Sequence, residues 1–259
     1  PDPHAETRVV PGRGGHAIPV RILRPLSRAA SGTYLHFHGG GWMFGEAVEN
    51  DGRLRQLCET TGLATLSVDY RLAPEHPFPA APEDCEDVAR AHLGGRLADL
   101  PAERLTIGGE SAGAHLAVLT LLRLRASGEA GRFSRANLVA GCFDLSLTPS
   151  VRRFGHERLV LNTADVEHFT NNFAPDLTIR IDPTLSPLFA DLTGLPPAFF
   201  TVGTRDLLLD DTLFMAARWL AAGNGARLSL WPGGCHVFQT FPSEASRRSL
   251  AEMAAFLGE

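Results

Sequence analysis

The sequence predicts an α/β fold: a mostly parallel, twisted sheet with helices on both faces. From about residue 34 onward, short apolar runs alternate with longer segments of helical periodicity, and this alternation is typical of parallel strands joined by crossover helices. The chain has 259 residues, a size at which α/β proteins often form one domain. Hydrophobic residues make up 44% and charged residues 20%, as in ordinary globular proteins. We therefore expect a single domain over residues 1–259.

The individual elements follow from the local pattern. Short apolar runs bounded by turn residues predict strands at 20–24, 34–37, 64–69, 105–108, 137–143, 198–203 and 227–231. Apolar residues at helical spacing predict helices at 48–60, 83–97, 112–126, 211–222 and 243–257. No helical pattern separates the earliest strands, so we expect them to pair antiparallel at one edge of the sheet.

One connection is much longer than the others. Residues 148–195 separate two predicted strands, whereas connections in compact domains usually have roughly 2–6 residues. The segment carries four prolines and one predicted helix, at 164–172. Long ordered insertions often form lids or substrate-binding walls. We expect 148–195 to contain a reduced cap inserted late in the chain, with a purely decorative insertion as the alternative.

Composition excludes several classes of function. All 24 basic side chains are Arg, and none is Lys. Schiff-base and pyridoxal-phosphate enzymes, Walker-A nucleotide hydrolases and Ser–Lys hydrolases all need a Lys, so these classes are excluded. The net charge of −5 and the lack of a basic run exclude nucleic acid as a partner. No apolar stretch approaches the roughly 20 residues of a membrane helix, so no membrane is expected as a partner.

The four cysteines give a default expectation for the compartment. Cys58, Cys85, Cys142 and Cys235 show no CxxC spacing and no regular pattern, which favours reduced thiols over disulfides. No signal peptide is visible. Because the chain begins at Pro1 rather than Met, it stays an open alternative that a segment was removed before Pro1. The default expectation is therefore the cytoplasm.

A serine motif stands at a predicted strand-to-helix turn. Residues 109–113 read Gly-Glu-Ser-Ala-Gly, and they join the strand predicted at 105–108 to the helix predicted at 112–126. In the G-x-S-x-G motif, the glycines let the chain bend sharply and lift the Ser hydroxyl above the sheet, in front of a helix N-terminus. This context predicts Ser111 as a nucleophile. The alternative is an ordinary Gly-rich turn with a Ser cap.

A glycine run follows an earlier strand. Residues 38–42 read His-Gly-Gly-Gly-Trp. Consecutive glycines allow peptide N–H groups to approach a ligand with no Cβ in the path, and each preorganised donor to an oxyanion is worth ~10²–10³ in rate. Together with the serine turn, the run predicts an oxyanion hole rather than a merely flexible loop.

A nucleophilic Ser needs a base and an orienting acid. Of the ten histidines, His236 follows the last predicted strand and a Pro-Gly-Gly turn, at the edge where a parallel sheet carries its active site. Asp206 ends the preceding strand at the same edge. Asp210 and Asp211 are rivals for the acid, but they precede a helical run and suit its first turn better. The order Ser111, Asp206, His236 is that of the α/β-hydrolase fold.

At this point the sequence resembles a known family, the hormone-sensitive-lipase-like esterases, which are bacterial family IV of the α/β-hydrolase fold. The resemblance rests on several motifs in order: His-Gly-Gly-Gly-Trp at 38–42, Asp-Tyr-Arg-Leu-Ala-Pro-Glu at 69–75, Gly-Glu-Ser-Ala-Gly at 109–113, Asp206 and His236. With Ser-Pro-Leu at 186–188 and Leu-Pro-Pro at 195–197, it covers nearly all of the chain from Val20 onward. It implies serine carboxylesterase activity on short-chain acyl esters, with no metal and no organic cofactor.

The resemblance also implies a role for each matching residue. Ser111 is expected to be the nucleophile, His236 the base and Asp206 its partner. The backbone N–H groups of Gly40, Gly41 and Ala112 are expected to form the oxyanion hole. His38 is expected to brace the glycine loop. Trp42 and Phe44 follow that loop, so either they line the acyl pocket as substrate-binding residues or they simply pack in the core.

Three departures from the family pattern stand out. Only residues 1–37 precede the glycine loop, so the N-terminal half of the cap is expected to be either absent or lost before Pro1, and its absence would leave the site more open. Leu207 follows Asp206 where the family often has Pro. Val237 follows His236 where Gly is common, which narrows the space near the base. None of these removes a catalytic group.

Other readings stay open beside the esterase. A relative with an altered reaction, such as an amide hydrolase or a dehydratase, would keep the same motifs, because leaving-group preference depends on the shape of the pocket. A non-catalytic small-molecule binding module is less favoured, since Ser111, Asp206 and His236 are all retained. The expected partner is a small-molecule ester. Pairing of family members through an edge strand makes a homodimer a further expectation.

Overall fold

The computed structural model describes residues 1–259 and contains one eight-stranded sheet, in the order β1-β2-β4-β3-β5-β6-β7-β8. The first two strands pair antiparallel with each other, β2 pairs antiparallel with β4, and every later pairing is parallel. The strands are β1 (Glu6–Pro11), β2 (Ala17–Leu23), β3 (Thr33–Phe37), β4 (Ala64–Val68), β5 (Leu105–Glu110), β6 (Phe133–Val139), β7 (Ala198–Gly203) and β8 (Ala226–Trp231). The predicted fold class is confirmed. An antiparallel edge is present, but the two earliest predicted strands, 20–24 and 34–37, do not pair with each other, because β4 lies between β2 and β3; the edge is formed by the unpredicted β1 and by β2.

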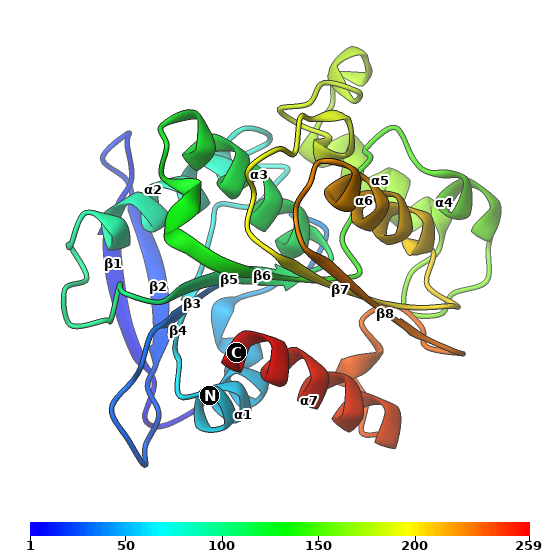
Figure 1. Ribbon diagram of the computed structural model, residues 1–259. Helices are drawn as coiled ribbons and strands as arrows, with labels where there is room; N and C mark the ends of the chain where they lie inside the picture. Colours follow the sequence, from blue (N-terminus) through cyan, green and yellow to red (C-terminus); the bar gives the residue numbers. More distant parts are fainter.

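Helices cover both faces of the sheet (Figure 1). α1 (Asp51–Thr61) and α7 (Glu244–Gly258) lie side by side on one face, whereas α2 (Ala80–Leu93), α3 (Ala112–Ala126) and α6 (Leu209–Ala221) cover the other. Most of the core lies between the sheet and this second group of helices, and a smaller apolar cluster lies under α1 and α7. α3 is buried on nearly all sides, as expected for a helix whose apolar residues run around its whole circumference.

Two strands differ from the sequence prediction. β1 is not predicted, because most of its side chains are polar or exposed and only Val10 is buried. β6 begins at Phe133 and ends at Val139, whereas the sequence predicts a strand at 137–143. The next residue, Ala140, has φ 45°, a left-handed conformation that turns the chain out of the sheet. The apolar residues at 140–143 are buried in the core instead of continuing the strand.

The long insertion contains two helices, α4 (Pro149–Phe154) and α5 (Thr163–Phe173). The helix predicted at 164–172 coincides with α5, while α4 is not predicted. α5 begins with a capping box: Asn162 Oδ1 accepts from the Asp165 N–H (3.0 Å), and Asp165 Oδ2 accepts from the Asn162 N–H (2.9 Å). In Figure 1 both helices lie beside α6, on the same side of the sheet.

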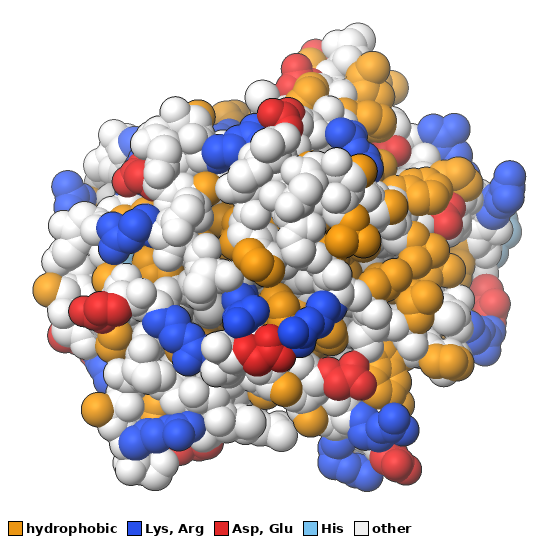
Figure 2. Space-filling model, in the orientation of Figure 1, with side chains coloured by type: hydrophobic (Ala, Val, Ile, Leu, Met, Phe, Trp, Pro, Cys, Tyr) orange, Lys and Arg blue, Asp and Glu red, His pale blue; other side chains and the backbone are white.

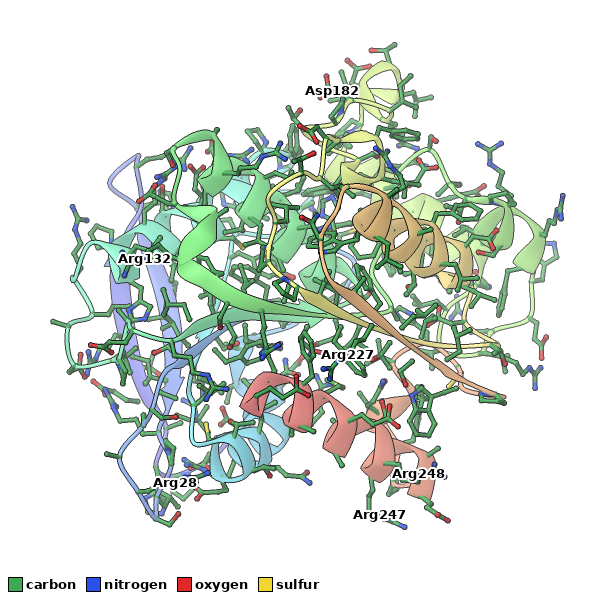
Figure 3. The ribbon with its side chains drawn as sticks, viewed as in Figure 1. Arg28, Arg132, Asp182, Arg227, Arg247 and Arg248 are labelled. Carbon is green, nitrogen blue, oxygen red and sulfur yellow. The ribbon has the colours of Figure 1, made fainter.

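β8 forms the free edge of the sheet opposite β1. Its Leu228 and Leu230 are 43% and 45% exposed, and Figure 2 shows hydrophobic side chains gathered on this side of the molecule. The neighbouring Arg227, labelled in Figure 3, donates to Glu259 (2.7 Å) at the end of α7. The ion pair thus joins the edge strand to the C-terminal helix, while the two leucines stay uncovered.

Candidate active site

The turn between β5 and α3 holds Ser111 in a strained conformation. Ser111 has φ 56° and ψ −121°, a region that residues other than Gly rarely adopt. A Cβ at Gly109 would lie 2.2 Å from the Phe37 carbonyl oxygen, and one at Gly113 would lie 2.0 Å from it. Only glycines therefore allow β3 to pass this close to the turn, and the turn places Ser111 at the N-terminus of α3.

Three strand ends bring the predicted catalytic side chains into contact. Ser111 Oγ lies 2.9 Å from Nε2 of His236, and Nδ1 of His236 lies 3.0 Å from Oδ2 of Asp206. Asp206 and His236 are 3% and 4% exposed, so solvent screens their interaction little. The N–H of Leu208 donates to Asp206 Oδ1 (2.9 Å) and fixes the carboxylate. The result is one continuous hydrogen-bonded chain from carboxylate to hydroxyl.

The glycine loop faces the serine turn with free backbone donors. Gly40 and Gly41 have φ 108° and 60°, and a Cβ on Gly40 would lie 2.2 Å from the Phe44 carbonyl oxygen. The N–H groups of Gly40 and Gly41 make no hydrogen bond within the chain, and Ala112 opens α3, where backbone N–H groups lack helical partners. These three N–H groups are the ones the sequence predicts as an oxyanion hole.

His38 and Tyr70 brace this loop from behind. His38 is buried, its Nδ1 lies 2.7 Å from the Gly39 carbonyl oxygen, and its ring stacks on that of Tyr70 at 4.3 Å. The Tyr70 hydroxyl donates to the His38 carbonyl oxygen (2.7 Å). Burial lowers the pKa of His38, which favours the neutral ring. His38 therefore has the contacts of a structural brace.

The reactive groups open into a cleft of about 610 Å³. Ser111 and His236 lie on its floor. The opposite wall comes from the insertion and includes Val160, Leu161 and Phe169. Phe169 packs edge-to-face on Phe44 at 5.6 Å, so the wall and the glycine loop meet through an aromatic pair. The sequence predicts a wall from 148–195, but it gives no signal for which of its side chains reach the cleft.

Comparison with known proteins agrees with this geometry. A family model described as alpha/beta hydrolase fold matches residues 34–240. The carboxylic ester hydrolase LipN of Mycobacterium tuberculosis is 35% identical over 249 residues, which are 89% of this chain and 64% of LipN. An esterase of Acinetobacter venetianus is 33% identical over 252 residues, which are 92% of this chain and 80% of that protein. The chain belongs to the hormone-sensitive-lipase-like carboxylesterases of the α/β-hydrolase fold.

A solved structure supports the same assignment. The esterase of the hyperthermophilic archaeon Pyrobaculum calidifontis matches this carboxylesterase with a TM-score of 0.92 at 31% identity, over 100% of this chain and 84% of that one. This chain spans just under two thirds of the length of LipN and larger shares of the other relatives named here. None of the helices of this carboxylesterase combines the length and the apolar character needed to cross a membrane.

Of the two residues expected to bind substrate, Phe44 lines the cleft and Trp42 does not. Phe44 lines the cleft and is 53% exposed. Trp42 is fully buried and does not line it, which corrects its expected place in the acyl pocket. Its ring stacks on Phe173 at 4.5 Å, and its Nε1–H donates to Nδ1 of His115 (3.1 Å). Burial lowers the pKa of His115 to about 4, so this ring stays neutral and can accept that bond.

The two rival acids lie away from His236. Asp211 accepts hydrogen bonds from the Phe143 N–H (2.7 Å) and the Thr148 hydroxyl (2.6 Å). Asp210 accepts from the Ser150 N–H (2.8 Å). Both therefore anchor the start of the insertion on α6. Burial raises the pKa of Asp211 to about 7, and this effect outweighs the hydrogen bonds to its carboxylate, which lower the pKa.

Proposed function

We propose that this carboxylesterase hydrolyses short-chain acyl esters through an acyl-enzyme intermediate on Ser111. One observation carries the proposal: a strained Ser is hydrogen-bonded to His236 and through it to Asp206, at the floor of an open cleft. The free N–H groups of Gly40 and Gly41 border the same cleft. This combination suits acyl transfer, which needs a nucleophile, a base and an oxyanion site together.

In the first half of the reaction, His236 Nε2 takes the proton from Ser111 Oγ as Oγ attacks the ester carbonyl carbon. The carbonyl oxygen becomes an oxyanion, which accepts hydrogen bonds from the N–H groups of Gly40, Gly41 and Ala112. His236 then gives its proton to the alcohol oxygen as the carbon–oxygen bond breaks. The alcohol leaves, and the acyl group stays on Ser111.

In the second half, His236 takes a proton from water as the water oxygen attacks the acyl carbon. The same N–H groups hold the second oxyanion. The bond to Ser111 then breaks, His236 returns the proton to Oγ, and the carboxylic acid leaves. Asp206 holds the His236 tautomer with Nε2 free to accept, and it stabilises the imidazolium that forms in each half.

We further propose that residues 148–195 act as the cap of a single domain and set the acyl or alcohol preference. Val160, Leu161 and Phe169 give the cleft its apolar wall, which suits a short hydrocarbon group.

The exposed edge strand β8 is where we propose that two copies pair. Leu230→Glu should convert a dimer to a monomer in light scattering, and a wild type that is monomeric at all concentrations would contradict the pairing.

The test of the function is a set of initial rates on p-nitrophenyl acetate, butyrate, octanoate and palmitate, with Ser111→Ala as the matched variant. Loss of the nucleophile should lower kcat by ~10⁶. Turnover of the short esters by wild type alone would support the proposal, and the chain-length series would report the depth of the cleft.

Equal activity of wild type and Ser111→Ala would contradict the proposal. Inactivity of both on esters, with turnover of amides by the wild type, would point to an amide hydrolase. Binding of ligands without turnover of any substrate would point to a binding module.

A further inference from the structure

A buried carboxylate next to the nucleophile is held by three parts of the chain at once. Glu110, the last residue of β5, is 8% exposed. Its Oε1 accepts a hydrogen bond from the Gly39 N–H (3.2 Å) and lies 2.9 Å from an Nη atom of Arg53. Its Oε2 lies 3.1 Å from Nε2 of His36, whose Nδ1 lies 2.8 Å from Ser67 Oγ. Glu110 thus joins β3, the glycine loop and α1.

Arg53 reaches this carboxylate from the first turn of α1 and belongs to none of the family motifs. The same Nη2 atom also donates to the side chain of Asn50. The Arg53 side chain is 25% exposed and lines the cleft. It is the only Arg that pairs with Glu110. The positive charge that balances this buried carboxylate therefore comes from a residue outside the motifs that carry the family resemblance.

We propose that Arg53 is a positioning residue for the oxyanion loop: it fixes the Glu110 carboxylate, which holds the Gly39 N–H and so aims the next two N–H groups at the reacting carbonyl. The inference rests on the ester hydrolysis proposed above. In this role Arg53 acts through Glu110 and not on the reacting atoms.

The loop needs such an anchor because consecutive glycines restrict the backbone very little. A misplacement of about 1 Å can cost ~10²-fold in rate, and a charged acceptor holds an N–H about twice as strongly as a neutral one. Burial by itself would raise the pKa of Glu110, but the Arg53 charge, the contact with the His36 ring and the hydrogen bond from the Gly39 N–H outweigh burial and hold that pKa well below its ordinary range. Arg53 thus keeps the anchor charged as well as in place.

The experiment compares Arg53→Met, Arg53→Lys and a matched control, Arg55→Met, on p-nitrophenyl butyrate. Arg55 lies on the same helix and pairs with Asp2 (2.7 Å), away from the cleft. We expect Arg53→Met to lower kcat by about 10–100-fold with KM changed by less than about threefold, since the oxyanion is held mainly in the transition state. Arg53→Lys should recover most of kcat, and Arg55→Met should leave it unchanged.

A double-mutant cycle separates a role through Glu110 from other roles. If Arg53 acts through Glu110, Arg53→Met added to Glu110→Gln should cost little beyond Glu110→Gln alone. A direct substrate contact of Arg53, or a purely structural role, would instead make the two losses multiply. If Arg53→Met does not fold, Arg53→Gln, which also removes the charge, takes its place in the cycle.

A pH profile gives a second readout. Removing Arg53 should let the pKa of Glu110 rise, so kcat of Arg53→Met should fall at acidic pH beyond the fall seen for wild type. The other titratable groups that face Glu110 are His36 and Tyr34 from β3, His38 from the loop and Tyr70, and they are common to all the variants.

Two results would overturn the inference: kcat of Arg53→Met within about threefold of wild type, or multiplying losses in the cycle. If either result is found while wild type is active and Ser111→Ala is not, the proposed ester hydrolysis is still supported and only the proposed role of Arg53 is contradicted. If wild type itself has no Ser111-dependent activity, the proposed function fails, and this inference fails with it.

Discussion

The floor and the wall of the cleft are built in different ways. On the floor, Ser111, Asp206 and His236 are buried and joined by hydrogen bonds at the ends of parallel strands. On the wall, Val160 is 46% exposed and Arg158 is 63% exposed, and both come from an irregular insertion. The sheet therefore sets the position of the reactive groups, whereas the insertion contributes shape. Changes to the floor should alter kcat, and changes to the wall should alter substrate preference.

The largest effect is expected from the floor. Asp206→Asn should lower kcat by ~10⁴, because the amide favours the His236 tautomer that cannot accept the Ser111 proton. KM should change little, since the cleft keeps its shape. Steady-state kinetics on p-nitrophenyl butyrate checks this. A loss similar to that of Asp210→Asn, which lies away from His236, would show that Asp206 is not the partner of the base.

A pH-dependent effect on the free energy of unfolding is expected at Asp211, which joins α6 to the start of the insertion that forms the wall. Asp211 holds the start of the insertion through Thr148, and burial raises its pKa from 3.8 to about 7. The folded protein therefore binds more protons than the unfolded chain between about pH 4 and 7, so this carboxyl contributes stability at low pH that is lost as pH rises through about 7. The free energy of unfolding of wild type, relative to Asp211→Asn, should fall over this range by up to about 4 kcal/mol.

Urea denaturation of both proteins at several pH values measures this difference. Parallel curves for wild type and Asp211→Asn would contradict the account of Asp211.

A smaller effect on rate is expected where the glycine loop touches the wall. A Cβ on Gly41 would lie 2.4 Å from the Phe169 ring, so Gly41→Ala should displace the loop and lower kcat by about 10–100-fold. Adding Phe169→Ala should restore part of this loss, because it removes the ring that the new methyl group meets. No recovery in the double variant would show that the strain of the positive φ, and not the ring, sets the cost.

The smallest effect is expected from the wall alone. Phe169→Ala should leave kcat on p-nitrophenyl acetate within about threefold of wild type, while the preferred acyl chain becomes longer, since an apolar group in such a pocket is worth ~1–3 kcal/mol per methylene at most. The chain-length series on p-nitrophenyl esters checks this. A large loss of kcat on acetate would mean that the wall also holds the floor in place.

The same difference explains what the sequence could predict. Parallel strands end at one edge of the sheet, so the ends of three predicted strands were enough to bring Ser111, Asp206 and His236 together. Trp42 could not be placed, because its partner His115 is 73 residues away in the sequence. Arg53 and Phe169 left no local signal either, since each reaches the cleft through packing between distant segments. The early end of β6 could not be predicted either, because the apolar pattern gives no sign of the positive φ of Ala140 that ends the strand.

The most direct test of the account is to identify the residue that becomes covalently modified. The protein would be incubated with diethyl p-nitrophenyl phosphate, which transfers a phosphoryl group to an activated serine, and the digested product would be analysed by mass spectrometry. The account predicts one adduct per chain, on the peptide that contains Ser111, and no adduct in Ser111→Ala or Asp206→Asn within the same time. An adduct on another residue, or equal labelling of the Ser111→Ala protein, would contradict it.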